Sequence, residues 1–312
     1  MARRCEIHGH RGARGLRPEN TLPAFEFALD LGITVLELDL HMTRDGVPVI
    51  CHDPKLSPKL ARRRADRAVP APETLPRLAA LTLDEVRGYV VDRNPEPRRF
   101  PDQRAEAEPL AEAFCRQRDL QPYGIPTLGG LFDFVAEYAA KGADHRKSAE
   151  QRRRSAQVGF NIELKRVPEQ PENIPDDFDG TGPARFETAV MDLIRSHDLV
   201  DRCIIQCFDW RVLPVFHRLE PKLALAALLD RRPAPGLIDR LAQTKATIYS
   251  PNHVHLTEAL VAEVRGSGRR VIPYTINEVA RMELLLDWEV NGLITDFPDR
   301  LLRLVQARHL DY

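Results

Sequence analysis

Three acidic residues lie in apolar runs, where a charged side chain is unusual. Glu37 and Asp39 are two positions apart, so on a strand their carboxylates share one face, and Glu163 lies in a later run of the same kind. Burial of such charges is unfavourable unless they are paired or bind a metal. Because carboxylate oxygens are good ligands for hard divalent cations, the three residues are predicted to hold a metal ion together.

Two histidines occupy comparable positions at the ends of apolar runs. His10 ends the first such run of the chain, and His52 comes directly after the run 47–51. Ion pairs of the carboxylates with Lys165 and Arg11 would explain the buried charges without any ligand. Such pairs leave the two histidines unexplained, so a reactive site is the stronger interpretation.

Apolar runs alternate with helical patterns along the chain, which is typical of parallel βαβ units. Only residues 43–46 separate the second run from the third, whereas a parallel crossover needs about a dozen residues. Since Asp45-Gly46 favours a hairpin, the third run is predicted to lie antiparallel to the end of the second. The other eight runs then predict an α/β fold of the (β/α)8 TIM barrel type. The nine runs are 5–9, 35–41, 47–51, 158–164, 203–208, 222–229, 247–250, 270–276 and 292–295.

Helical patterns follow most of these runs, and two longer segments interrupt them. Residues 53–125 are rich in Pro, Arg and Glu. They are interpreted as a cap or subdomain inserted between the second barrel strand (35–41) and the second helix (131–140). A second excursion covers residues 165–183, after the third barrel strand. We therefore expect one barrel domain over 1–312 with its functional groups at the carboxyl ends of the strands. The predicted helices are 22–31, 131–140, 185–197, 210–218, 235–243, 257–266 and 278–288.

Composition narrows the classes of partner and location. The 312 residues include 45 Lys plus Arg and 46 Asp plus Glu, a net charge of -1, which argues against bulk affinity for nucleic acid or membranes. No apolar run approaches the roughly 20 residues that span a bilayer, and the first residues lack the apolar core of a secretory signal. We expect a cytoplasmic protein without integral membrane association.

The motifs, taken in order, resemble the glycerophosphodiester phosphodiesterase family, among the barrels related to phosphatidylinositol phospholipase C. Each motif alone is weak, but the ordered set is specific and covers the chain apart from the two excursions. The motifs are His10-Arg11-Gly12, Pro18-Glu19-Asn20-Thr21, Glu37-Leu38-Asp39, Asp45-Gly46-Val47-Pro48-Val49, His52-Asp53, Ile125-Pro126-Thr127-Leu128, Glu163-Leu164-Lys165, Tyr274-Thr275-Ile276-Asn277 and Gly292-Leu293-Ile294-Thr295-Asp296.

This resemblance implies metal-dependent hydrolysis of a small-molecule glycerophosphodiester to glycerol 3-phosphate and an alcohol. His10 and His52 match the family's general acid/base pair, and Arg11 and Lys165 match the cations that face the phosphate. One imidazole would deprotonate the nucleophile while the other protonates the departing oxygen, in either order. Direct attack by water and closure of a cyclic phosphate by a glycerol hydroxyl both stay open. The matching ligands of the cation, Mg or Ca, are Glu37, Asp39 and Glu163.

Some residues depart from the family pattern or suggest other functions. Cys207-Phe208 stands where the family usually has Ser-Phe, and Tyr274 replaces a usual Trp, which leaves the alcohol of the substrate undefined. His8-x-His10 is compatible with an amidohydrolase-type metal site. That class also needs a Lys on the fourth strand, where this chain has Gln206, and His8 is better explained as a packed residue. A non-catalytic phosphoester-binding barrel is the third hypothesis.

Overall fold

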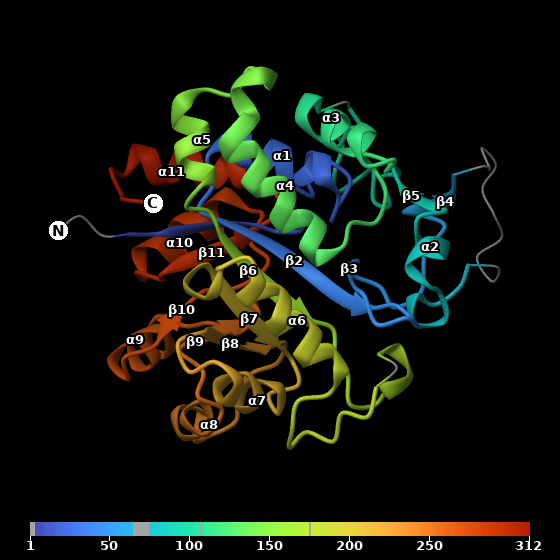
Figure 1. The fold of residues 1–312 in the computed structure, drawn as a ribbon. Helices are drawn as coiled ribbons and strands as arrows, with labels where there is room; N and C mark the ends of the chain where they lie inside the picture. Colours follow the sequence, from blue (N-terminus) through green and yellow to red (C-terminus); the bar gives the residue numbers. More distant parts are fainter. Residues whose placement is uncertain (1–3, 65–74, 107, 175) are drawn as a thin grey trace.

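The computed structural model describes residues 4–64, 75–106, 108–174 and 176–312. Eight strands of this part form a nearly closed parallel barrel with helices around it (Figure 1). The predicted (β/α)8 fold is confirmed, and each predicted barrel strand overlaps an observed one. The strands are β1 (Glu6–Gly9), β2 (Val35–Met42), β6 (Gly159–Leu164), β7 (Cys203–Cys207), β8 (Ala224–Leu229), β9 (Ile248–Pro251), β10 (Arg270–Val271) and β11 (Gly292–Thr295).

The strands follow one another around the barrel in the order β10-β9-β8-β7-β6-β2-β1-β11. Backbone hydrogen bonds join the two ends of this order, from Asn291 N to Val271 O at 2.9 Å and from Ile294 N to Pro273 O at 3.0 Å. Strand β10 is shorter than the predicted run 270–276. Pro273 has no N–H to donate to the ladder, which accounts for the early end of the regular pairing.

Helices cover the outside of the barrel and bury one large apolar core against the strands. Helix α1 begins after Thr21, whose hydroxyl accepts from Ala24 N, and ends at Gly32 with φ 79°, a conformation that glycine adopts without strain. The helices around the barrel are α1 (Leu22–Leu31), α4 (Leu128–Lys141), α5 (Ala149–Ser155), α6 (Arg185–Ser196), α7 (Val212–Leu219), α8 (Leu237–Gln243), α9 (Glu258–Gly266), α10 (Val279–Asp287) and α11 (Pro298–Ala307).

The interior of the barrel contains a smaller apolar layer and a polar region. The apolar layer fills the side of β7 to β11 and consists of Ile204, Ala226, Ile248, Ile272 and Ile294. His8 belongs to the polar region, where it is fully buried and contacts Glu6 at 3.1 Å and the Asn161 amide at 3.4 Å. These contacts confirm that His8 is a packed residue of the barrel interior.

A short strand leaves the barrel directly after β2. Strand β3 (Pro48–Ile50) pairs antiparallel with β2, with Leu40 opposite Ile50 and Met42 opposite Pro48, as the hairpin at Asp45-Gly46 predicts. Its direction returns the chain toward the barrel mouth. His52 therefore comes back beside the carboxyl end of β2.

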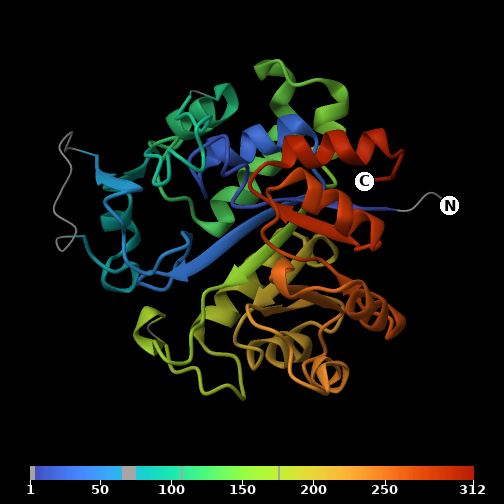
Figure 2. The ribbon, with the colours of Figure 1, turned by 180° about the vertical axis from the view of Figure 1, so that it is seen from behind.

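The segment after β3 forms a small unit with its own apolar core. Its two strands pair with each other, Val90 of the second also forms a bridge with Gly124, and in its described residues the unit adds no strand to the barrel. The unit lies beyond the carboxyl end of β2, as the two opposite views show (Figures 1 and 2). Its elements are β4 (Ala61–Arg63), η2 (Leu78–Ala80), α2 (Leu83–Val86) and β5 (Tyr89–Val91). Helix α3 (Pro109–Gln117), later in the same segment, packs its apolar side chains into the main core of the barrel.

Candidate active site

Strands β2 and β6 bring three buried carboxylates together at the barrel mouth, and we call Glu37, Asp39 and Glu163 the mouth cluster. Asp39 and Glu163 are direct partners in the parallel ladder, and Glu37 lies two residues before Asp39 on the same face. One carboxylate oxygen of each residue lies within 4.8 Å of those of the others. The side chains are buried, so the predicted metal ligands meet at one point.

Neighbouring polar groups donate hydrogen bonds to only some of the carboxylate oxygens of the mouth cluster. Glu37 accepts hydrogen bonds from the backbone N–H of Arg11 at 3.0 Å and from the side-chain amide of Gln206 at 2.8 Å. Asp39 accepts from Asn20, but its buried Oδ1 accepts no hydrogen bond from any described residue. An unsatisfied buried carboxylate oxygen beside two further carboxylates fits an oxygen-ligated divalent cation.

Two cationic side chains border the mouth cluster. Lys165 Nζ is 2.7 Å from Glu163 Oε1 and 3.5 Å from Asp39 Oδ1. Arg11 Nε is 3.2 Å from Asp39 Oδ2, and its Nη1 donates to Glu19 at 2.7 Å. Both predicted phosphate-facing cations therefore lie beside the predicted metal ligands, and the ion pairs weighed in the sequence analysis exist alongside the cluster.

The carboxylates repel one another strongly because they are buried. Burial, followed by the charges of Asp39 and Glu163, raises the pKa of Glu37 well above its usual value. Burial likewise raises the pKa of Glu163. Burial alone would also raise the pKa of Asp39, but Arg11, His52 and Lys165 outweigh it and lower that pKa. The raised pKa of Glu37 and of Glu163 is consistent with a site that takes up positive charge, as a proton or a cation.

A tight glycine turn carries His10 and Arg11 into the mouth. Gly12 has φ 88°, and a Cβ at this position would lie 2.8 Å from the backbone of Ala24 on α1. A Cβ on Gly9 would lie 2.2 Å from the carbonyl oxygen of Gly12. Glycine is therefore required at Gly9 because the turn folds back on itself, and at Gly12 because the loop packs directly against α1.

His10 is held by a buried carboxylate that the sequence analysis did not assign to the site. Its Nδ1 lies 2.5 Å from Asp296 Oδ1, while its Nε2 faces Glu37 at 3.9 Å. Burial alone would raise the pKa of Asp296, but His10, Arg14 and Asn277 outweigh it and lower that pKa. Asp296 therefore stays ionised and keeps the hydrogen of His10 on Nδ1. Asp296 comes directly after β11, at the carboxyl end of a barrel strand. This position is the sequence signal that could have assigned it to the site.

His52 has a similar but more exposed arrangement. Its Nδ1 lies 2.7 Å from Asp53 Oδ1, and the two side chains are 33% and 44% exposed. His10, in contrast, is only 11% exposed, and burial lowers its pKa despite the opposing charge of Asp296. Each imidazole thus has its Nδ1 next to a carboxylate, and its Nε2 forms no hydrogen bond with a described residue.

One cavity of about 260 Å³ connects these groups. Both histidines, both predicted phosphate-facing cations and two carboxylates of the mouth cluster line it, and Asp39 lies against them. His253 and His255, in the turn η6 (His253–His255), are not among its lining residues. The lining consists of His10, Arg11, Arg14, Glu37, His52, Arg99, Glu163, Lys165, Gln206, Phe208, Leu228, Tyr274, Thr275 and Ile294.

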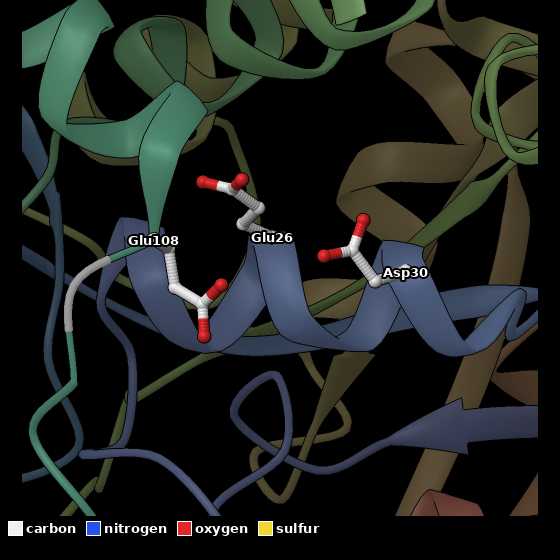
Figure 3. Close-up of side chains that lie close together, drawn as sticks. All are labelled: Glu26, Asp30 and Glu108. Carbon is white, nitrogen blue, oxygen red and sulfur yellow. The ribbon is translucent and has the colours of Figure 1, made fainter. Parts of the chain in front are cut away.

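A second group of three carboxylates lies on the outside of the barrel, and we call Glu26, Asp30 and Glu108 the α1 cluster (Figure 3). Lys147 Nζ lies between two of them, 2.6 Å from Glu26 and 2.7 Å from Asp30. Glu26 also accepts from the first backbone amides of α3, at Leu110 and Ala111. The α1 cluster is therefore a neutralised structural network that ties α1 to the inserted segment.

Comparison with known proteins agrees with this geometry. The model of the glycerophosphoryl diester phosphodiesterase family matches residues 10–300. The chain belongs to this family. It is 27% identical to a glycerophosphodiester phosphodiesterase of Bacillus subtilis, over 93% of this chain and 83% of the relative. It is 24% identical to one of Caldanaerobacter subterraneus, over 96% and 97%.

Solved structures of phosphodiesterases have a similar fold. A candidate glycerophosphoryl diester phosphodiesterase of Silicibacter pomeroyi has a TM-score of 0.78 and 28% identity, over 99% of this chain and 96% of that one. An Oleispira antarctica phosphodiesterase, solved with the product sn-glycerol-3-phosphate, has a TM-score of 0.68 and 19% identity, over 96% of both chains. The family resemblance expected from the motifs is confirmed.

Proposed function

We propose that the chain hydrolyses glycerophosphodiesters to glycerol 3-phosphate and an alcohol at the mouth cavity. His10 and His52 act as the general acid/base pair, and Arg11 and Lys165 bind the phosphate. The mouth cluster holds a divalent cation, Mg or Ca, which would neutralise charge on the non-bridging phosphate oxygens. The supporting observation is the shared cavity, which joins both histidines, both cations and the carboxylates.

The two histidines carry the proton transfers. In each, the carboxylate at Nδ1 orients the ring and leaves Nε2 for the nucleophile or for the departing oxygen. The planar guanidinium of Arg11 and the ammonium of Lys165 supply donors to the phosphate oxygens, whose negative charge is delocalised in the transition state. The surrounding barrel wall keeps these groups in place before substrate binds.

Several parts of the proposal concern the surroundings of the reaction rather than its chemistry. The substrate is a small glycerophosphodiester, and we propose no nucleic-acid partner. None of the helices in residues 4–64, 75–106, 108–174 and 176–312 is long and apolar enough to cross a bilayer. The cytoplasmic location stays a prediction from the sequence.

A substrate panel with a coupled assay for glycerol 3-phosphate tests the proposal. Purified protein, with its metal content measured, should release glycerol 3-phosphate from at least one of the choline, ethanolamine and glycerol diesters when Mg or Ca is supplied. Binding of the diesters without turnover would support a phosphoester-binding barrel instead. Turnover of amide substrates alone would support the amidohydrolase hypothesis.

A further inference from the structure

Two further arginines line the cavity, one from the barrel and one from the inserted segment. Arg14 belongs to the loop after β1, and Arg99 belongs to the segment that follows β5. Apolar and aromatic side chains line another part of the cavity. Phe208 and Leu228 come from the ends of β7 and β8, and β8 lies four steps from β1 in the order β8-β7-β6-β2-β1. We call Phe208 and Leu228 the apolar wall of the cavity, and Arg14 and Arg99 its cationic wall.

A buried phenylalanine holds the cationic wall in place. The guanidinium carbons of Arg14 and Arg99 lie 4.9 and 5.0 Å from the centre of the Phe100 ring, so both arginines contact the same aromatic group. Phe100 is fully buried and packs against Phe297 at 6.0 Å between ring centres. The segment also attaches to the barrel loop through Gln103, whose amide donates to Arg14 O at 2.6 Å.

The two arginines differ in how fully their charges are satisfied. Arg14 is 12% exposed and lies 2.5 Å from Glu19 and 2.9 Å from Glu96. Arg99 is 46% exposed, and its two carboxylate contacts within the described residues are longer, 3.3 Å to Asp296 and 3.5 Å to Glu96. A guanidinium has five N–H donors, so Arg99 has donors available to a ligand in the cavity.

We propose that Arg99 determines specificity for the alcohol of the substrate by binding an anionic group, a phosphate or a carboxylate, carried by that alcohol. The inference rests on the proposed function, because it needs a diester phosphate at the mouth cluster. In this proposal the phosphate lies between Arg11 and Lys165, and the alcohol is the substituent that extends toward the cationic wall. A substituent with a positive charge would be repelled by Arg99, and an anionic one would be attracted.

Three glycerophosphodiesters test this inference: one with a choline alcohol, one with a glycerol alcohol, and one whose glycerol alcohol carries a second glycerophosphate. A fourth, whose alcohol is a hydroxy acid such as glycerate and so carries a carboxylate without an ammonium group, separates a carboxylate ligand from a phosphate ligand. The wild-type kcat/KM should be higher for the anionic substrates than for the choline substrate. R99Q should lower this anionic-to-choline ratio about fivefold, and R99E about 20-fold, because Arg99 is half-exposed and its interactions are screened.

Matched variants separate this role from a general effect of charge. R99K keeps the charge and should keep most of the preference, whereas R98E changes a neighbouring exposed arginine that does not line the cavity and should leave the ratio unchanged. The preference should also shrink at high ionic strength.

The possible outcomes distinguish the two proposals. An equal loss of kcat/KM for all substrates in R99Q, or an unchanged ratio in R99E, overturns the role of Arg99 while the proposed hydrolysis stands. Absence of turnover with every diester in the presence of Mg or Ca overturns the proposed function, and this inference with it. A ratio that falls in the order wild type, R99Q, R99E supports both.

Discussion

The mouth cluster and the α1 cluster contain the same kinds of side chain at similar spacing, yet they differ in what surrounds them. In the α1 cluster, Lys147 pairs with Glu26 and Asp30, Arg17 pairs with Glu108 at 2.7 Å, and the first amides of α3 donate to Glu26. In the mouth cluster, Lys165 and Arg11 border the carboxylates, Asp39 Oδ1 accepts no hydrogen bond from the described residues, and a cavity of about 260 Å³ adjoins the group. Proximity of carboxylates and pairing with cations are therefore common to both clusters; an unsatisfied carboxylate oxygen beside an open cavity is what supports the proposed metal site at the mouth cluster.

Removal of the cation or of its ligands should give the largest effect and should occur at the mouth cluster alone. A chelator should abolish turnover, and Mg or Ca should restore it. E37Q or D39N should weaken metal binding and lower turnover about 10³-fold or more, because the charge on the phosphate is then less stabilised. The control E108Q in the α1 cluster should keep its activity. Full activity of a verified metal-free sample would contradict the proposed site.

The histidines are the second difference between the two clusters. H10A and H52A should each lower turnover roughly 10²–10⁴-fold, because each removes a proton-transfer group, and both variants should stay folded and retain the cation. Steady-state kinetics with circular dichroism and metal analysis would check this. Near-wild-type turnover in either variant would remove that histidine from the mechanism.

The carboxylate partners of the histidines should matter according to their burial. D296N should lower kcat about 10²-fold by weakening the preference for the Nδ1 hydrogen of His10, with little change in metal content. D53N should have a smaller effect, about tenfold, because Asp53 and His52 are partly exposed. Comparison of the pH profiles of kcat would show whether each carboxylate acts through its histidine. Equal effects of the two substitutions would mean that burial does not set their importance.

Lys147 is predicted to be the feature that makes the α1 cluster structural. K147M should lower the free energy of unfolding by about 3 kcal/mol, because it leaves Glu26 buried without its cation. The folded variant should keep its turnover, since Lys147 does not line the mouth cavity. K141M, on the exposed end of α4, is the matched control. Urea unfolding with and without Ca would also show whether the emptied cluster gains metal-dependent stability, which would make the two clusters alike.

The smallest predicted effect is a pH dependence. It concerns the difference in the free energy of unfolding between wild type and K147M. Burial alone would lower the pKa of Lys147, but hydrogen bonds to Asp30 and Glu26 outweigh it and raise that pKa in the folded protein. The stabilisation is therefore fully present below the unfolded pKa, near 10.5, and is lost as the pH rises through the higher folded pKa. Unfolding of wild type and K147M from pH 7 to 11 would check this. Loss of the difference near pH 7 would contradict it.

Much of the fold could be predicted because hydrophobic runs and caps are local signals. The helix 22–31 and the antiparallel turn at Asp45-Gly46 follow from residues that are adjacent in sequence. The inserted segment gave no such signal. Its apolar residues are scattered, and Tyr89 and Leu78 become a core only when the segment folds on β3. Helix α11 was not predicted from the sequence, although Pro298 stands at its first turn.

The sequence by itself determined which side chains could react, because residue type and two-residue spacing are local properties of a strand. It placed Glu37, Asp39, Glu163 and the two histidines at strand ends. Tertiary structure alone decided which partners those groups have. Asp296 reaches His10 from 286 positions away, and Arg99 reaches the same cavity from an inserted segment. These contacts arise from barrel closure and from the docking of Phe100, long-range packing that no local pattern encodes.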